Sequence, residues 1–365
     1  MVTVLPGDPV YTMFGHSALR FVDPQSGFDA SFNYGTFDFD RSFPLRFASG
    51  RLDYRLSVEP TQPSFRQYQL EGRTILEQHL ALDPAAVGRL YALLLENYRP
   101  ENRYYRYDFF FDNCSTRIRD MIEAATGGFV GASPGDTVRS QPGGQLSLRD
   151  LLEPYTERRP VLGALMHTAL GVGADRPATE REKAFLPIEL LKQIDRSHIP
   201  GSTMVVSIDT LYDAGPLPES RVLMATWAVW LVVLAVMAAS VVRFWKGRPR
   251  IRSVDVSIFA AAGVAGLLLV YLWFGSEHVV ASKNLNILWA WPTHVLAAAC
   301  LTKRHLPAWM RGYLAIFAAS AVIFLCGLLW WTQEVPALML PIVLLLAFRA
   351  GRCLLPASTN RPAKA

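Results

Sequence analysis

Three long stretches without a charged side chain dominate the C-terminal part of the sequence. They cover residues 222–242, 256–276 and 312–333, and they are 21, 21 and 22 residues long. An α-helix rises about 1.5 Å per residue, so each stretch is long enough to cross a hydrocarbon core of about 30 Å. Helices buried in soluble proteins are rarely this long and this apolar. We therefore predict that the chain crosses a membrane.

Two further apolar stretches are weaker candidates. Residues 284–302 are interrupted by a proline and a histidine, and residues 335–348 span only 14 positions and contain two prolines. With these two stretches, we predict a transmembrane domain of about five helices over residues 221–355. Residues 356–365 are expected to form a tail on the cytoplasmic side.

Charged residues predict how the chain is oriented. Residues 1–220 carry 22 basic and 28 acidic side chains, whereas residues 221–365 carry 14 basic and 3 acidic ones. The segments that follow the five apolar stretches hold 5, 1, 3, 0 and 4 basic residues in turn. Because basic loops stay in the cytoplasm, the C-terminus is expected there and residues 1–220 outside it. The basic residues lie between apolar stretches and not on a folded face, so nucleic acid is excluded as a partner.

An exported domain of this size needs a targeting signal. Residues 1–9 contain neither the charged first region nor the apolar core of a signal peptide. We expect either that the start is truncated or that a cleaved signal lies outside this numbering.

Residue patterns in the first 220 positions predict a mixed domain of strands and helices, which is an α+β fold. Strands are expected over residues 10–22, 28–39, 66–82 and 204–211, the first two joined by a turn at 23–27. Helices are expected over residues 84–98, 115–125, 148–152, 160–170 and 180–195. Asp83 is the expected N-cap of the first helix, and a Gly/Pro/Ser-rich loop is expected over residues 131–144.

Cys114 is the one cysteine within residues 1–220 of a chain that has four. It cannot form a disulfide within its own domain, although that domain faces an oxidising compartment. It lies at the start of a predicted helix, where unpaired amides and the helix dipole favour a thiolate and are suited to bind an oxyanion. A catalytic nucleophile and a buried structural cysteine are both compatible with this segment.

A thiolate nucleophile needs an imidazole beside it that accepts and returns protons. His16 follows a glycine on a predicted strand and is the leading candidate. His79 alternates with apolar neighbours, as a surface strand residue does, and His167 and His198 belong to helix or loop segments.

Several motifs together resemble one bacterial family. They are GHSALRF at residues 15–21, NYGTFDF at 33–39, RLDY at 51–54, YYRYDFFFDNCSTRIRD at 104–120 and NLNILWAWP at 284–292. Over about residues 3–300 the chain is similar to the Lnb-type lipoprotein N-acyltransferases. The motifs that contain His16 and Cys114 are specific when taken together, whereas either alone is a weak signal.

The resemblance implies a fold and a reaction. The N-terminal periplasmic domain is expected to be a permuted papain-like (NlpC/P60-type) thiol-enzyme domain, similar to the branch that includes lecithin:retinol acyltransferase. Cys114 is the implied nucleophile, and His16 is the implied general base and acid. An acyl chain is expected to pass from a phospholipid, through a thioester on the cysteine, to the N-terminal amine of a diacylglyceryl-cysteine lipoprotein. The reaction needs no metal or cofactor, and its place is the bacterial inner membrane.

A third residue usually orients the imidazole of such a pair. Asn33, on the neighbouring predicted strand, is the preferred candidate because its amide oxygen can accept the ring N–H. Asp38 is the alternative. An equally compatible interpretation is that Asn33 and Gly35 only shape the end of the strand.

The substrate-binding candidates are Tyr34, Asn113 and Arg117. Arg117 is expected either to bind a phospholipid phosphate or to belong to a solvated or salt-bridged helix face. The approach to the thiol is expected to be apolar, to open toward the membrane and to be walled by Phe14, Phe109, Phe110 and Phe111.

Two functions of other classes remain open. One is a membrane-anchored papain-like cysteine peptidase or amidase that acts on peptidoglycan or peptide; a single span would suffice as its anchor, so five spans argue against it. The other is a degenerate domain that binds lipid without catalysis, which an intact His/Cys pair disfavours.

Overall fold

The computed structural model describes residues 1–38, 40–128, 130–131, 146–199, 202–216, 222–303 and 305–355. Contacts divide the chain into two compact units. The first comprises Met1–Leu151 with Pro177–Pro218, and the second comprises Leu152–Arg176 with Glu219–Ala365. The expected tail and nearly all of the expected Gly/Pro/Ser-rich loop lie outside the described residues.

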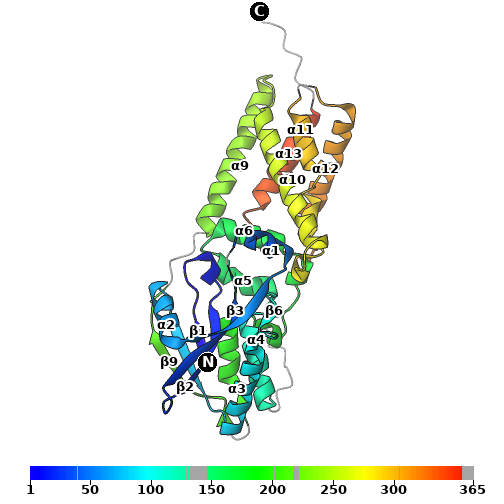
Figure 1. The fold of residues 1–365 in the computed structure, drawn as a ribbon. Coiled ribbons are helices and arrows are strands. Elements are labelled where there is room, and N and C mark those ends of the chain that lie inside the picture. Colours follow the sequence, from blue (N-terminus) through cyan, green and yellow to red (C-terminus); the bar gives the residue numbers. More distant parts are fainter. Residues whose placement is uncertain are drawn as a thin grey trace, which may run out of the picture. The chain divides into compact units, whose positions relative to one another are not determined.

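An antiparallel sheet of seven strands forms the framework of the first unit (Figure 1). Its order is β6-β4-β3-β2-β1-β5-β9. The strands are β1 (Val2–Val4), β2 (His16–Asp23), β3 (Phe28–Thr36), β4 (Asp53–Pro60), β5 (Ile75–Leu80), β6 (Tyr104–Arg106) and β9 (Val205–Tyr212). A separate pair is formed by β7 (His198–Ile199) and β8 (Ser202–Thr203). The expectation of a mixed domain of strands and helices is confirmed.

Helices of the first unit surround this sheet. They are α1 (Phe43–Ser49), α2 (Thr61–Leu70), α3 (Pro84–Tyr98), α4 (Cys114–Thr126), α7 (Glu180–Lys183) and α8 (Pro187–Arg196), and the residues of α5 (Leu148–Thr156) are divided between the two units. Helix α4 packs between α3 and the strands β2 and β3, and Ile118 and Ile122 bury its inner face in the core. Asp83 caps α3 as predicted, because its side chain accepts from the N–H of Ala86.

Three details of the first unit differ from the predictions. The strand expected over residues 66–82 is the end of α2 followed by β5, because 66–71 are good helix formers without β-branching and the strand begins only after Gly72. The strand expected over residues 10–22 begins at His16, after a 3₁₀ turn, η1 (Val10–Thr12). The helix expected over residues 180–195 is interrupted before Pro187, which lacks an N–H and starts a new helix.

Among the residues that the structure describes, three helices of the second unit are long and apolar enough to cross a membrane: α9 (Val222–Trp245), α10 (Arg252–Phe274) and α12 (Ala308–Gly327). The other elements are α6 (Pro160–Ala169), η2 (Val172–Ala174), η3 (Val279–Ala281), η4 (Leu285–Leu288), α11 (His294–Leu301) and α13 (Leu340–Leu354). The stretch 284–302 is therefore two short helical pieces with Pro292 between them, and α13 has 15 residues. That these two stretches also cross stays a prediction.

Buried amides join residues 152–176 to the rest of the second unit. The Asn284 side-chain amide donates to the carbonyl oxygens of Thr168 (2.8 Å) and Leu170 (3.2 Å). Gln333 donates to the Asn284 amide oxygen at 3.0 Å, and both side chains are almost completely buried. That the two domains meet at residue 220 stays a prediction. By its packing, the segment of residues 152–176 belongs to the same compact unit as the apolar helices.

A buried ion cluster connects three helices of the same unit. The Asp255 carboxylate of α10 accepts from Arg250 and from Arg349 of α13, and Arg349 also donates to the hydroxyl of Ser240 on α9 at 2.6 Å. Asp255 and Arg349 are at most 1% exposed. A buried charge is tolerated when it is paired in this way, so the cluster fixes the mutual positions of α9, α10 and α13.

Gly266 allows α10 to pack directly against the backbone near Ala290. A Cβ atom at position 266 would lie 2.1 Å from the carbonyl oxygen of Ala290, whereas at Gly312 on α12 it would meet nothing within 4 Å. We predict that Gly266→Ala lowers the free energy of unfolding by about 1–3 kcal/mol, because backbone must move to admit the methyl group. Gly312→Ala, the matched control, should be neutral or stabilising by up to about 1 kcal/mol. Unfolding in mixed micelles checks this, and equal stability of the two variants would contradict the close packing.

Candidate active site

Asn113 fixes the position of Cys114 at the start of α4. Its amide oxygen accepts from the backbone N–H groups of Ser115 (2.9 Å) and Thr116 (3.0 Å), and the Thr116 hydroxyl oxygen accepts from the Asn113 backbone N–H. This is a capping box, which satisfies amides that a helix start leaves without partners. Cys114 is therefore held as the first helical residue, half-buried, with its side chain at the positive end of the helix dipole.

A buried pair of hydroxyls joins this helix start to strand β2. Ser17 Oγ lies 3.0 Å from Ser115 Oγ, and both residues are completely buried. Each serine directly follows one of the two catalytic candidates, His16 and Cys114. The contact therefore brings the first residue of β2 next to the first residue of α4.

His16 lies between an amide oxygen and the thiol. Its Nε2 atom is 3.1 Å from Oδ1 of Asn33, a residue of β3 that is 5% exposed. An amide oxygen only accepts, so Nε2 carries the proton in this contact. The remaining nitrogen, Nδ1, is available to Cys114, and His16 lowers the pKa of that thiol.

These contacts set the protonation of the thiol. Burial on its own raises the pKa of Cys114. The hydrogen bond and charge of His16 oppose this, and bonds from the Ser17 backbone and the Ser115 hydroxyl act in the same direction as His16. The result is a pKa of Cys114 below the ordinary cysteine value, which is the condition for a reactive thiolate.

Gly35 lets strand β3 approach the cysteine. The strand has an irregularity between Asn33 and Thr36, and Gly35 within it has φ +88°, a conformation that favours glycine. A Cβ atom at position 35 would lie 3.5 Å from Cβ of Cys114 and 3.8 Å from the Tyr107 ring. Burial raises the pKa of Tyr107 well above its ordinary value, so the wall on this side of the thiol is a neutral aromatic ring.

The three substrate-binding candidates have different surroundings. Tyr34 is 1% exposed, its ring packs edge-on against Tyr105, and burial raises its pKa. The Asn113 side-chain nitrogen donates to two carbonyl oxygens, at 2.8 Å each, so this side chain is engaged within the protein. Arg117 forms a two-pronged ion pair with Asp112 and lies 4.1 Å from the centre of the Tyr105 ring.

The aromatic residues around the cysteine motif pack mainly with one another. Phe14 and Phe109 have ring centroids 4.7 Å apart, and Phe109 and Phe110 both contact Phe185. Phe110 is buried, whereas Phe111 is 38% exposed. That they wall a path from the membrane to the thiol stays a prediction.

The remaining candidates have other partners. Asp38 pairs with Arg55 at 2.7 Å and is not the partner of His16. His79 pairs with Asp209 at 3.0 Å on neighbouring strands, and His167 bonds the Thr156 hydroxyl, also at 3.0 Å. His198 belongs to the short strand β7.

The structure adds residues that the sequence patterns did not single out. Ser17, Ser115 and Tyr107 contribute to the surroundings of the thiol. The sequence could have indicated the two serines, since each directly follows His16 or Cys114 in the chain. It had no such signal for Tyr107, because the role of this residue depends on how β3 bends at Gly35. Among the described residues, no group of three His, Cys, Asp or Glu side chains is placed to hold a metal ion.

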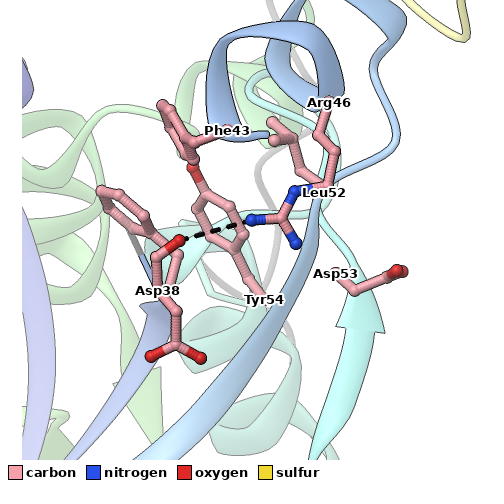
Figure 2. A pocket seen from close by; sticks show the side chains of 7 residues that line it. Asp38, Phe43, Arg46, Leu52, Asp53 and Tyr54 are labelled. Carbon is pink, nitrogen blue, oxygen red and sulfur yellow. Dashed lines mark hydrogen bonds between the residues drawn. The ribbon is translucent and has the colours of Figure 1, made fainter. Parts of the chain in front are cut away.

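The first unit also contains a small pocket that is separate from the surroundings of Cys114 and His16 (Figure 2). It is lined by Phe37, Asp38, Phe43, Arg46, Leu52, Asp53 and Tyr54. The Arg46 guanidinium reaches across it to the backbone oxygen of Asp38, at 3.4 Å. Asp38, the alternative orienting residue, lines this pocket, whereas Cys114, His16 and Asn33 do not.

Two family models match the chain. Residues 1–141 match the Lnb N-terminal periplasmic domain, and residues 219–360 match the Lnb transmembrane domain. Searches of curated proteins and of solved structures return no match.

The lowered pKa of Cys114 predicts how its reactivity depends on pH. Alkylation follows the thiolate fraction, so Cys114 should react at a lower pH than an ordinary cysteine. In His16→Gln the opposing effect of burial remains, and we predict that the midpoint of the alkylation profile moves to higher pH. His79→Gln, an exposed histidine of the same unit, should leave the midpoint unchanged. Iodoacetamide labelling, read on the peptide that contains Cys114, checks this, and an unshifted midpoint in His16→Gln would disprove the pairing.

Proposed function

Since the chain belongs to the Lnb family, with an N-terminal periplasmic domain and a C-terminal transmembrane domain, we propose that it is a thiol-dependent lipoprotein N-acyltransferase of the bacterial inner membrane. Membership of the family suggests this activity. The mechanism is supported most by one observation: His16 lies between the Asn33 amide oxygen and the Cys114 thiol.

The first half of the proposed reaction loads the cysteine. The thiol proton of Cys114 passes to His16, and the sulfur attacks an ester carbonyl of a phospholipid. The tetrahedral intermediate collapses, the bond to the glycerol oxygen breaks, and His16 returns a proton to that oxygen. The products are an acyl thioester on Cys114 and a lysophospholipid.

The second half unloads it. The N-terminal amine of a diacylglyceryl-cysteine attacks the thioester carbonyl, and His16 accepts the proton that the amine loses. The carbon–sulfur bond breaks, an amide forms on the lipoprotein, and Cys114 is regenerated. The same histidine thus acts as base, acid and base again, and the cycle consumes no oxidant, metal or nucleotide.

The start of α4 supplies a means to stabilise the negative charge of both tetrahedral intermediates. Asn113 occupies the N–H groups of Ser115 and Thr116, while the N–H of Cys114 lies in the first turn, where helix amides have no acceptor within the helix. We assign this N–H to the oxyanion. Asn33 orients the ring of His16, as the third member of a triad does.

Roles for the substrate-binding candidates follow from their surroundings. Arg117, one turn after Cys114, keeps its guanidinium partly exposed beside Asp112 and is proposed to contact the phospholipid phosphate. Tyr34 is proposed to line the site from β3. Asn113 is proposed to act by holding Cys114 in place.

The periplasmic domain is proposed to be permuted papain-like. Three features support this: the histidine precedes the cysteine in the chain, the cysteine starts a helix, and that helix packs on antiparallel strands that carry His16 and Asn33. The loop charges support a cytoplasmic C-terminus. A soluble peptide or glycan substrate would need no more than an anchor, whereas both lipid substrates need a catalytic domain held at the bilayer by a transmembrane domain.

The covalent mechanism predicts how cysteine and histidine variants behave. Cys114→Ala and Cys114→Ser should each lose about 10³-fold or more in acyl transfer, because the thiolate path is removed and a serine hydroxyl is far harder to deprotonate. His16→Gln should lose about 10²–10⁴-fold. Cys326→Ala and His79→Gln are the matched controls and should keep wild-type rates. Mass spectrometry of a diacylated lipopeptide incubated with protein and phospholipid measures the added chain, and full activity of Cys114→Ala would refute the mechanism.

A further inference from the structure

Helix α1 presents large apolar side chains to the outside of the first unit. Leu45 is 76% exposed and Phe47 is 54% exposed, although the helix has only seven residues. Arginines 41, 46 and 51 precede, interrupt and follow it. Exposed apolar side chains that share a short segment with basic ones are typical of an interaction surface.

The other side of α1 packs against the segment that precedes the helix. Phe43 stacks on Phe37 with centroids 5.0 Å apart, and Arg46 pairs with Asp40 at 3.1 Å. Gly50 ends the helix in the left-handed conformation, with its N–H bonded to the last turn. Leu45 and Phe47 therefore lie on a helix that packs through Phe43 and ends at a defined residue.

Stacked rings continue from α1 to the neighbourhood of the thiol. Phe37 stacks on Tyr54 at 4.9 Å, and Tyr54 stacks on Tyr107 at 4.2 Å. Tyr107 in turn lies next to Gly35, which faces Cys114. The exposed side chains and the candidate active site are thus joined by packed aromatic side chains within one rigid core.

We propose that α1 is an interfacial helix that inserts Leu45 and Phe47 into the periplasmic leaflet of the phospholipid bilayer. The transmembrane helices of this chain keep the domain beside a bilayer at all times, so the bilayer is the apolar surface always within its reach. Two side chains bury on the order of 300 Å², far below the roughly 1,000 Å² of a specific protein interface. Arginines at both ends suit the phosphates of the headgroups, and the apolar pair suits the region below them.

Insertion of α1 deepens the proposed function, because it names where the periplasmic domain meets its acyl donor. The statement that α1 meets the acyl donor rests on the proposed function. The insertion itself is a physical property that can be measured without catalysis. The stacked rings beneath α1 then connect the point of membrane contact to the neighbourhood of the thiol.

Photo-crosslinking of the full-length wild-type protein tests the insertion. The protein is reconstituted in vesicles of phosphatidylethanolamine and phosphatidylglycerol that contain a phospholipid with a diazirine on its acyl chain. Trypsin then releases residues 42–46 with Leu45 and residues 47–51 with Phe47. It also releases residues 67–73 with Leu70, an equally apolar side chain that is 84% exposed at the end of α2 and serves as the matched control.

We expect lipid adducts on residues 42–46 and 47–51 and none on residues 67–73. In a Leu45→Ser, Phe47→Ser variant the serine peptides should lose their adducts, while peptides of the transmembrane helices keep theirs. Absence of adducts from both α1 peptides, or equal yield on residues 67–73, would overturn the proposal. If adducts form on α1 but the protein transfers no acyl chain, the proposed function fails and the insertion stands. If acyl transfer occurs while α1 takes no adduct, the insertion fails and the function stands.

Discussion

The side chain of Asn113 determines the geometry around Cys114, because all of its hydrogen-bonding capacity is used at the start of α4. Its oxygen accepts two backbone N–H groups of the first turn, and its nitrogen donates to the carbonyls of Phe109 and Phe185. The helix start is thereby fastened both to the preceding loop and to a segment more than 70 residues later in the chain. Cys114 needs no contact of its own to be held in place.

His16 opposes the effect of burial on Cys114. A half-buried thiol is harder to ionise than one in water, but a hydrogen-bonded imidazole and the Ser17 backbone N–H make its thiolate form favourable. Asn33 accepts from Nε2 of the ring, which leaves Nδ1 available for the thiol. Such a site can exchange protons without moving its side chains, which suits a reaction whose two halves need a base and an acid in alternation.

Residue type and motif position predicted that Cys114, His16 and Asn33 belong to one site. The structure brings these side chains together, and their catalytic roles stay a prediction. The sequence also predicted the helices that, within the described part of the chain, are long and apolar enough to cross a membrane, because an uncharged stretch of 21 or 22 residues is rare elsewhere. It did not predict α2, because residues 66–71 were assigned to the same strand as the residues after Gly72, which do form β5. It also did not predict the pairing of Ser17 with Ser115 or of Asn284 with Thr168, which depends on contacts about 100 residues apart. Long-range polar contacts leave no local pattern.

Intact-mass analysis after incubation with phospholipid tests whether the acyl chain passes through the Cys114 sulfur. We predict that the wild-type protein gains the mass of one acyl chain, located on the peptide that contains Cys114 and removed by a diacylated lipopeptide. Acyl transfer at the normal rate without such an adduct, or with the adduct on another residue, would contradict the covalent mechanism.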